Sequence, residues 1–421
     1  MKTVLFVPTF WHSSLELFNL FCQKLGKQVK KVLLETGDPN YNKFRNNDIQ
    51  SDYVNAYFDE VHFLSFPQNL KKNYSTFLNI VRYQKQFKKI FDKYNPDLII
   101  TTGDRNHFYP FLQNCKRSNV QILMFQESLL SVRYYLGQKK KENIKQRINE
   151  QWSILSAVIF KIFNSRFNVF GLRPLILIDH TKGWGLNDIK NQLFLWGPLT
   201  EKLFIEHRCN INSLGNPLID NLYNKEGVKN KKNENLSAGI GCDPSKNTIL
   251  ISAPCLADVK NTSELFFWYK SIVDAFSELN IVIKIHPRDD INNFKMLADY
   301  QNICIVKEKY SFKELLQISD LSLSHYSATT IDAVAFGLPV ILLPMTAVGG
   351  DDREHWFSSP IFLKPKSIDS CIHLINEVLK ESYKNEYNSE RDSFMFDMFS
   401  ENVGHSTDII IKEINKILKS N

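Results

Sequence analysis

The chain has 421 residues, of which 43% are hydrophobic and 23% charged, and its formal net charge is +7. This is more residues than one hydrophobic core usually organises, so the chain is expected to form two or three domains of about 150–200 residues each. The composition is that of a folded protein and excludes disorder over most of the length. The mild positive charge fits a lysine-rich surface, or attraction to phosphate-rich donors or an anionic membrane. No zinc-finger spacing, RNP motif or basic-zipper pattern is present, so we expect no nucleic-acid partner.

Cysteine usage and hydropathy indicate the compartment. The seven cysteines are scattered without a C-x-x-C pair, which is typical of reduced thiols in a cytosol. The N-terminal run MKTVLFVPTF is too short for a signal peptide and predicts a first β-strand. The sequence contains no uninterrupted apolar stretch of about 18 residues, so no membrane-spanning helix is expected. We therefore expect a cytoplasmic protein, with peripheral contact at the inner face of the cell membrane as an open alternative.

The first half of the chain alternates short apolar runs with helical patterns. The expected strands are 2–9, 31–35, 97–102 and 120–126, and the expected helices are 13–27, 75–94 and 107–117. Such alternation predicts a parallel sheet that is covered by helices on both faces.

A basic stretch, 139–147, runs into the apolar segment ILSAVIFKIF at 154–163 and then into 168–178. One interpretation is a buried helix followed by a strand, because short apolar runs usually belong to a core. The other is an interfacial segment across 139–178 that contacts a membrane and receives a lipid-linked acceptor.

A polar segment rich in Asn, Lys, Gly and Ser separates two α/β series. It covers 224–247 and is expected to be a linker. The domains predicted around it are 1–223 (acceptor-binding), 248–405 (nucleotide-donor-binding) and a closing C-terminal helix at 406–421. In the second series the expected strands are 247–253, 281–285, 302–306, 320–324 and 339–343, and the expected helices are 263–279, 312–318, 329–336, 368–380 and 406–419. The fold class is thus α/β, with two Rossmann-like doubly wound domains facing a central cleft, where ligands bind outside the carboxyl ends of the strands.

The first polar motif is KIHPR, at the end of the strand expected over 281–285. Pro287 stops the strand and fixes the turn, which directs His286 toward the ligand edge. Lys284 and Arg288 would balance phosphate charge. The guanidinium of an arginine can donate two parallel hydrogen bonds to one phosphate. The alternative is a basic surface loop with a hydrogen-bonded histidine.

The second motif, DLSLSHYSATTID at 320–332, leads from a strand through a hydroxyl-rich turn into a helix. The first N–H groups of that helix are unpaired and carry partial positive charge, so a phosphate would bind there. Asp332 would accept a hydrogen bond from a ribose hydroxyl. Ordinary N-capping by Ser327 or Thr329 is the alternative, and it is compatible with anion binding. The two motifs together give the expected donor-binding residues Lys284, His286, Pro287, Arg288, Ser324, Tyr326, Ser327, Thr329, Thr330 and Asp332.

These motifs, followed by G-x-P-V at 337–340, resemble the donor domain of bacterial GT-B-fold transferases. The resemblance is nearest to the CDP-glycerol glycerophosphotransferases and capsule or wall-polymer enzymes, and HP-motif sialyltransferases have a comparable arrangement. Segment 215–220, after Trp-Gly-Pro at 196–198, resembles the interdomain crossing of UDP-GlcNAc 2-epimerases. The resemblance implies that His286 and the hydroxyl motif contact the nucleotide and phosphates of the donor.

The catalytic base has two candidates in the N-terminal half, where the sequence departs from the wall-polymer enzymes. These commonly have His-Gly after an N-terminal strand, whereas here the strand at 120–125 is followed by Gln126-Glu127-Ser128. Glu127 could deprotonate an acceptor hydroxyl if burial raised its pKa. Asp104, after the strand DLIITT, is the other candidate, with a turn Asp paired to Arg105 as its alternative. We keep both, together with His286, as candidate catalytic residues.

Motifs of other enzyme classes are absent from the sequence. There is no D-x-D pair for a metal-bound diphosphate, so we expect no metal and no cofactor besides the donor. Walker A, GxGxxG and GxSxG motifs are also absent.

The sequence therefore predicts a metal-independent glycosyltransferase that uses a nucleotide-activated sugar to build a capsule, lipopolysaccharide or wall polymer. A cytidine donor linked through CMP or CDP is favoured over a UDP-linked one, and the acceptor would be a glycan or a lipid-linked glycan. The alternatives are a UDP-sugar 2-epimerase, a CDP-polyol phosphotransferase and a scaffold without catalysis.

Overall fold

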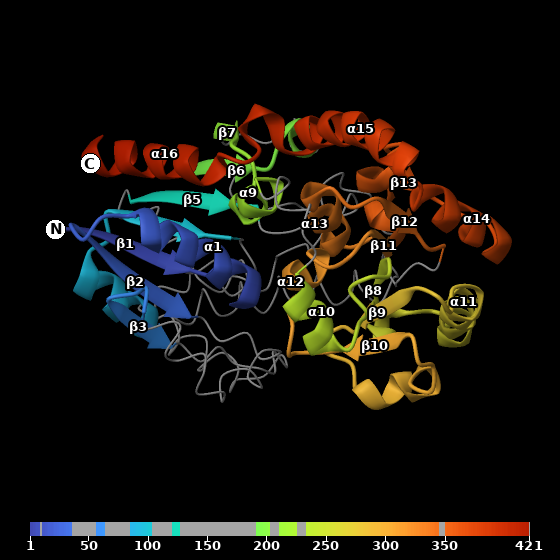
Figure 1. The fold of residues 1–421 in the computed structure, drawn as a ribbon. Helices are drawn as coiled ribbons and strands as arrows, with labels where there is room; N and C mark the ends of the chain where they lie inside the picture. Colours follow the sequence, from blue (N-terminus) through green and yellow to red (C-terminus); the bar gives the residue numbers. More distant parts are fainter. Residues whose placement is uncertain are drawn as a thin grey trace, which may run out of the picture. The chain divides into compact units, whose positions relative to one another are not determined.

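The structure is a computed structural model, and it describes residues 1–8, 11–35, 56–63, 85–102, 120–126, 191–202, 210–224, 233–344 and 350–420. The chain divides into two compact units (Figure 1). Unit 1 comprises Met1–Glu127, Val132–Pro217 and His405–Asn421, and unit 2 comprises Ser128–Ser131 and Leu218–Gly404.

Unit 1 is built on a seven-stranded sheet of order β3-β2-β1-β4-β5-β6-β7, in which every pair of neighbours is parallel. Its strands are β1 (Lys2–Val7), β2 (Val29–Glu35), β3 (Glu60–Phe63), β4 (Leu98–Thr101), β5 (Gln121–Phe125), β6 (Asn191–Leu195) and β7 (Asn210–Ser213). The chain starts in the middle of the sheet and extends it to one side and then to the other. The expectation of a parallel sheet is confirmed.

Helices cover both faces of this sheet. Phe87 and Phe91, in the helical residues 85–94, pack against Leu5 and the β-branched residues of β1 and β2. Alternate residues of a strand face opposite ways, so Phe6 lies on the other face. There its ring contacts Phe18 of α1 (Trp11–Lys24) at a centroid distance of 5.2 Å. Helix α16 (Ser406–Ser420) packs on α1, so the end of the chain belongs to unit 1.

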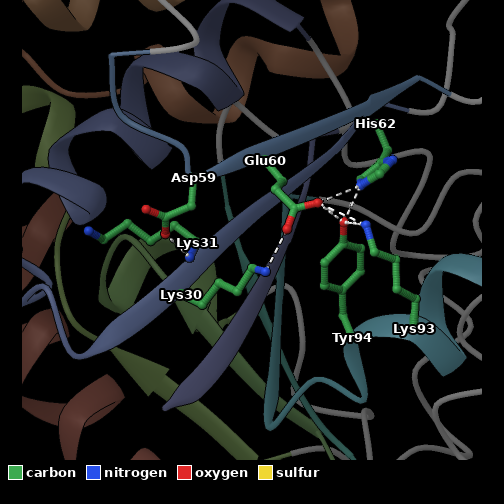
Figure 2. A network of polar contacts seen from close by, with 7 residues as sticks. All are labelled: Lys30, Lys31, Asp59, Glu60, His62, Lys93 and Tyr94. Carbon is green, nitrogen blue, oxygen red and sulfur yellow. Dashed lines mark hydrogen bonds and ion pairs between the residues drawn. The ribbon is translucent and has the colours of Figure 1, made fainter.

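A polar network joins the start of β3 to β2 and to the helical residues 85–94 (Figure 2). Glu60 accepts from Lys30 Nζ at 2.5 Å and from Lys93 Nζ at 2.9 Å. It also accepts from the hydroxyl of Tyr94, which lies 2.5 Å from Nε2 of His62. The hydrogen bonds from Lys30, Tyr94 and Lys93 lower the pKa of Glu60 to about 2. The network fixes the edge strand to the helix that covers it.

Unit 2 contains a six-stranded parallel sheet of order β10-β9-β8-β11-β12-β13. Its strands are β8 (Thr248–Ser252), β9 (Asn280–Lys284), β10 (Ile303–Val306), β11 (Leu321–Ser324), β12 (Val340–Leu342) and β13 (Phe362–Leu363). The winding is the same as in unit 1, and β8, the first strand, again lies in the middle. Its neighbours β9 and β11 continue the sheet in opposite directions.

One face of the unit 2 sheet packs on α11 (Thr262–Ala275) and α14 (Ile368–Val378), with Ile249, Ile251 and Leu323 in the core between them. Helix α13 (Ala328–Phe336) contacts β11, β12 and α15 (Glu381–Phe399). The remaining helices are α8 (Pro198–Glu201), α9 (Pro217–Tyr223), α10 (Glu234–Ile240), α12 (Phe312–Leu316) and the 3-10 turns η5 (Leu256–Asp258), η6 (Ile291–Leu297), η7 (Gly350–Phe357) and η8 (Ser400–Asn402).

Several elements differ from those expected. The segment 224–247, expected as a linker, contains α10, which begins at the cap Asn233 and ends at the left-handed Gly241. The two-residue strand β13 and the 19-residue helix α15 were not predicted either. The expected helix at 107–117 and the segment 139–178 lie outside the described residues.

Candidate functional site

The carboxyl ends of β8, β9 and β11 lie side by side in the middle of the unit 2 sheet. Ser252 at the end of β8 pairs with Lys284 at the end of β9, and Ile251 pairs with Leu323 of β11. The connections after β8 and β11 leave from neighbouring strands at the point where the strand order reverses. In open α/β sheets this is the place where ligands bind.

Three hydroxyl groups meet at the beginning of α13. Ser327 is the N-cap, and its Oγ accepts from the backbone N–H of Thr329 at 3.4 Å. The Thr329 hydroxyl donates to Ser327 Oγ at 3.0 Å and lies 2.9 Å from Ser252 Oγ. Ser327 and Thr329 are half-buried, so this end of the helix remains accessible. The N–H groups of the first helical turn and these hydroxyls are hydrogen-bond donors of the kind that can bind an anion.

A second pair of hydroxyls supports the turn from inside. Ser324 Oγ lies 2.7 Å from Thr330 Oγ1, and Thr330 donates to the carbonyl of His325 at 2.7 Å. Both residues are fully buried. The sequence predicted donor contacts for Ser324 and Thr330, but the structure encloses their hydroxyls between β11 and α13. They hold the turn in shape, because buried hydroxyls need such partners.

The His-Pro loop follows β9 directly. The backbone N–H of Arg288 donates to Nδ1 of His286 at 3.2 Å, and the N–H of Asp289 donates to the His286 carbonyl at 2.9 Å. In the neutral ring, Nε2 therefore carries the proton and can donate to a ligand. Burial, and then the charge of Arg288, lower the pKa of His286, which favours this neutral form. Pro287 is exposed on the loop.

Two of the basic residues expected to face the donor have protein partners. Lys284 Nζ donates to the carbonyl of Tyr310 at 2.7 Å and also to the carbonyl of Lys307. Burial lowers the pKa of Lys284. Arg288 forms an ion pair with Asp258 in the turn after β8. Lys284 thus fixes the loop after β10, and the exposed Arg288 links the loops that follow β8 and β9.

Tyr326 and Asp332 flank the beginning of α13. The Tyr326 ring stacks on Phe357 with a centroid distance of 4.9 Å and an interplanar angle of 7°. Lys364 Nζ lies 6.0 Å from the centroid of the same ring. Asp332 is half-buried in the second turn of the helix. The aromatic stack fixes the half-buried Tyr326 next to the hydroxyl edge.

The sequence did not predict two residues at the carboxyl ends of the unit 2 strands, Asp289 and Ser252. Asp289 is 6% exposed and accepts from the Leu256 N–H at 3.1 and 3.2 Å, so it fixes the loop that follows β8. Ser252 is the last residue of β8. A polar residue at the carboxyl end of a predicted parallel strand is a candidate for ligand contact, and that position could have identified it from the sequence.

Asp104 and Glu127, the candidate bases, lie outside the described residues, but the strand ends before them are described. Thr102 Oγ1 lies 2.7 Å from Ser14 Oγ, which ties the end of β4 to α1. Gln126 Oε1 accepts from the Trp196 N–H at 3.0 Å, and its carbonyl accepts from Trp196 Nε1 at 2.9 Å. Both candidates follow the carboxyl ends of adjacent, fixed strands of unit 1.

Comparison with protein-family models gives one match, over residues 197–416, just over half of the chain. The matched family is described as CDP-Glycerol:Poly(glycerophosphate) glycerophosphotransferase, a transferase. The chain belongs to this family. The matched range includes the strand ends, the His-Pro loop and α13, so the site belongs to the part that defines the family. A search of curated proteins gave no significant match.

Solved structures with the same fold include a UDP-GlcNAc 2-epimerase from Methanocaldococcus jannaschii, with 14% identity, a TM-score of 0.60 and coverage of 99% of this chain and 100% of that one. A UDP-glucosyltransferase from Polygonum tinctorium matches at 10% identity and TM-score 0.58, over 100% and 99% of the two chains. The wall teichoic acid polymerase TagF, in a CDPG soak, matches at 11% identity and TM-score 0.56, over 100% and 89%. These likenesses show a GT-B-like fold, as the sequence predicts.

No helix within the described ranges is both long and apolar enough to cross a membrane. The segment 139–178, for which the sequence suggests membrane contact, is not among them.

Proposed function

We propose that this family member transfers a polyol phosphate from a cytidine diphosphate donor to a hydroxyl of a growing surface polymer. One observation carries the proposal: the family match spans a strand edge where three hydroxyls and the first turn of α13 form an anion-binding edge. A diphosphate donor needs such a site for its charge. The family name and the structural similarity to TagF support a CDP-linked donor.

The proposed reaction breaks the P–O–P bridge of the donor. An acceptor hydroxyl attacks the phosphorus that carries the polyol, a new O–P bond forms, and CMP leaves with the electrons of the bridging bond. Charge on the leaving phosphate grows as the bond breaks. The N–H groups at the start of α13, Ser327, Thr329 and the Nε2–H of His286 stabilise that charge. Asp332 accepts from a ribose hydroxyl, and Arg288 adds positive charge beside the loop.

Glu127 or Asp104 is proposed to take the proton of the acceptor hydroxyl. The strand end before each of them is held by hydrogen bonds. The acceptor is a glycan or a lipid-linked glycan, and the segment 139–178 is proposed to bring the enzyme to the membrane that carries it.

Turnover of CDP-glycerol by a variant of His286 tests this proposal. We expect His286→Ala to lower CMP release by about 10²-fold or more, as for loss of one preorganised donor to developing charge. His373→Ala, at an exposed position on α14, is the matched control and should leave the rate unchanged. An unchanged rate in His286→Ala would remove this histidine from the mechanism.

Glycosyl transfer from a nucleotide sugar is the second candidate. It is favoured by Gln126-Glu127 at the end of β5, where wall-polymer enzymes commonly have His-Gly. The two reactions differ in what they release and in what they transfer: CDP-polyol gives CMP and leaves a phosphate in the product, a CDP- or UDP-sugar gives the intact diphosphate, and a CMP-sugar gives CMP without adding phosphate to the product. Chromatography of the released nucleotide, together with a phosphate assay of the product, distinguishes them. Donor consumption without any acceptor would instead indicate an epimerase.

A further inference from the structure

We propose that Cys255, His286 and Asp289 form a binding site for a zinc ion. Cys255 lies in the loop after β8, and the other two lie in the His-Pro loop after β9. Among the residues that the structure describes, one ligand atom from each of the three lies within 4.8 Å of the others. The expectation of no metal rested on the missing D-x-D pair; this site is of a different kind, because it contains a thiol and an imidazole.

The buried carboxylate of Asp289 provides the first argument. The side chain is 6% exposed, and its oxygens accept from the Leu256 N–H and the Cys255 thiol. Within the described part of the chain it forms no ion pair with a lysine or arginine, since its neighbour Arg288 pairs with Asp258. A buried carboxylate without a counter-ion is costly, and a bound divalent cation would compensate its charge.

The geometry provides the second argument. Cys255 Sγ lies 3.7 Å from Asp289 Oδ1. Ligand atoms in a tetrahedral zinc site, with bonds of about 2.0–2.3 Å, are roughly 3.3–3.8 Å apart. This pair already has that spacing, and the His286 nitrogen lies within 4.8 Å of both atoms, so a small approach of the ring completes a three-ligand face. The Leu256 N–H would continue to hold the carboxylate in place, as outer hydrogen bonds do at metal sites.

The ligand types select the metal. A thiolate, an imidazole and a carboxylate suit zinc, whereas magnesium and calcium prefer oxygen ligands alone. Binding releases the thiol proton of Cys255 to solvent, and the two anionic ligands then neutralise the two charges of the ion. Three protein ligands leave a fourth position for water.

The nitrogen of His286 that binds zinc decides whether zinc and donor phosphate compete, a consequence that rests on the proposed function. The ring now accepts from the Arg288 N–H at Nδ1 and offers Nε2–H to a phosphate. Zinc at Nε2 would replace the proton that the phosphate needs and would compete with the donor, whereas zinc at Nδ1 would displace only the Arg288 N–H and leave Nε2–H to the phosphate. The effect of zinc on donor binding therefore distinguishes the two modes of metal binding.

Zinc titration of the reduced full-length protein against a chromogenic chelator tests the site. We expect one tight zinc per chain, with affinity reduced at least tenfold in both Cys255→Ser and Asp289→Asn. The matched control is Cys242→Ser with Cys304→Ser, because these thiols lie 3.7 Å apart and offer a rival site. A second control replaces Cys115 and Cys209, and both control variants should bind zinc as the wild type does.

A cobalt titration keeps the test valid if a variant loses stability. Cobalt in the wild-type site should show a thiolate charge-transfer band that disappears in Cys255→Ser, with folding checked by circular dichroism. Equal zinc affinity in wild type and Cys255→Ser, or loss only in the Cys242/Cys304 control, would overturn the site. CDP binding is measured separately, with and without zinc. If CDP does not bind at all, the proposed function is refuted, but the zinc site is still supported by the zinc titration.

Discussion

At the scale of single residues, the hydroxyls that follow β11 differ in exposure. Ser327 caps α13 and is half-buried, while Ser324 and Thr330 are enclosed in the turn. The sequence shows a run of hydroxyl residues but cannot show which of them face outward. That distinction comes from the fold of the turn between β11 and α13, which buries Ser324 and Thr330 and leaves Ser327 partly exposed.

Ser327→Ala separates capping from donor binding. We expect it to cost about 1 kcal/mol of unfolding free energy, as for loss of an N-cap, and to weaken donor binding at least tenfold. Ser367→Ala, which removes the cap of α14, should cost similar stability without affecting the donor. Urea unfolding and calorimetry measure the two effects. If both variants bind the donor equally well, Ser327 serves only as a cap.

At the scale of elements, α13 is fixed at both ends. Its last turn is held by Arg391 of α15, which is 0% exposed and donates to the carbonyls of Val334 and Ala335 at 2.9 and 2.7 Å. The guanidinium also lies 4.8 Å from the centroid of the Tyr223 ring. A cation at the carboxyl end of a helix complements its dipole. Arg391 thus positions α13, the helix that is proposed to bind the donor phosphate.

Arg391→Met tests this role. The shape of the side chain is largely kept, but the carbonyls of Val334 and Ala335 lose the donor that Arg391 provides, and the Val334 carbonyl keeps the Gly337 N–H at 2.8 Å. We therefore expect a loss of about 1–3 kcal/mol in stability. We also expect a higher KM for the donor and faster amide exchange in α13, with Arg391→Lys intermediate. If KM and exchange in α13 stay unchanged while stability falls, α13 does not depend on Arg391 for its position.

The Glu60 network predicts a pH dependence for unit 1. The folded pKa of Glu60 is about 2, against an ordinary value of 4.5. The carboxylate therefore contributes stability above about pH 4.5 that is lost as the pH falls toward 2. Partial exposure of the network keeps the effect small. Glu60→Gln should be less stable than wild type at pH 6, and the two should converge at pH 2–3 in thermal melts. Parallel curves over that range would contradict the low pKa.

The elements also show what the sequence could predict. Apolar runs such as TILIS and IVIK identified the buried strands, because parallel strands covered on both faces are continuously apolar. The short edge strand β13 and the polar β7 (NINS) lack that signal. Helix α15 has a buried stripe made of Tyr387, Phe394, Met395, Met398 and Phe399, but Arg391 lies in the same stripe. In sequence Arg391 resembles a surface charge, although its side chain is buried.

At the scale of the whole molecule, the two sheets have the same winding, and the family model covers residues 197–416. The sequence predicted that the HP motif and the hydroxyl turn each follow a strand, and they follow β9 and β11, which lie on either side of β8. Donor binding by these motifs stays a prediction. The zinc ligands escaped prediction because Cys255 and Asp289 are 34 positions apart and meet only in the fold.

Calorimetric titration of CDP and of cytidine into the full chain, and into Ser327→Ala/Thr329→Val, tests the anion-binding edge most directly. We expect one CDP per chain, much weaker binding of cytidine, and at least a tenfold loss of CDP affinity in the double variant, or about 1.4 kcal/mol. Equal affinity for CDP and cytidine, or unchanged CDP binding in the double variant, would contradict a phosphate site at the start of α13.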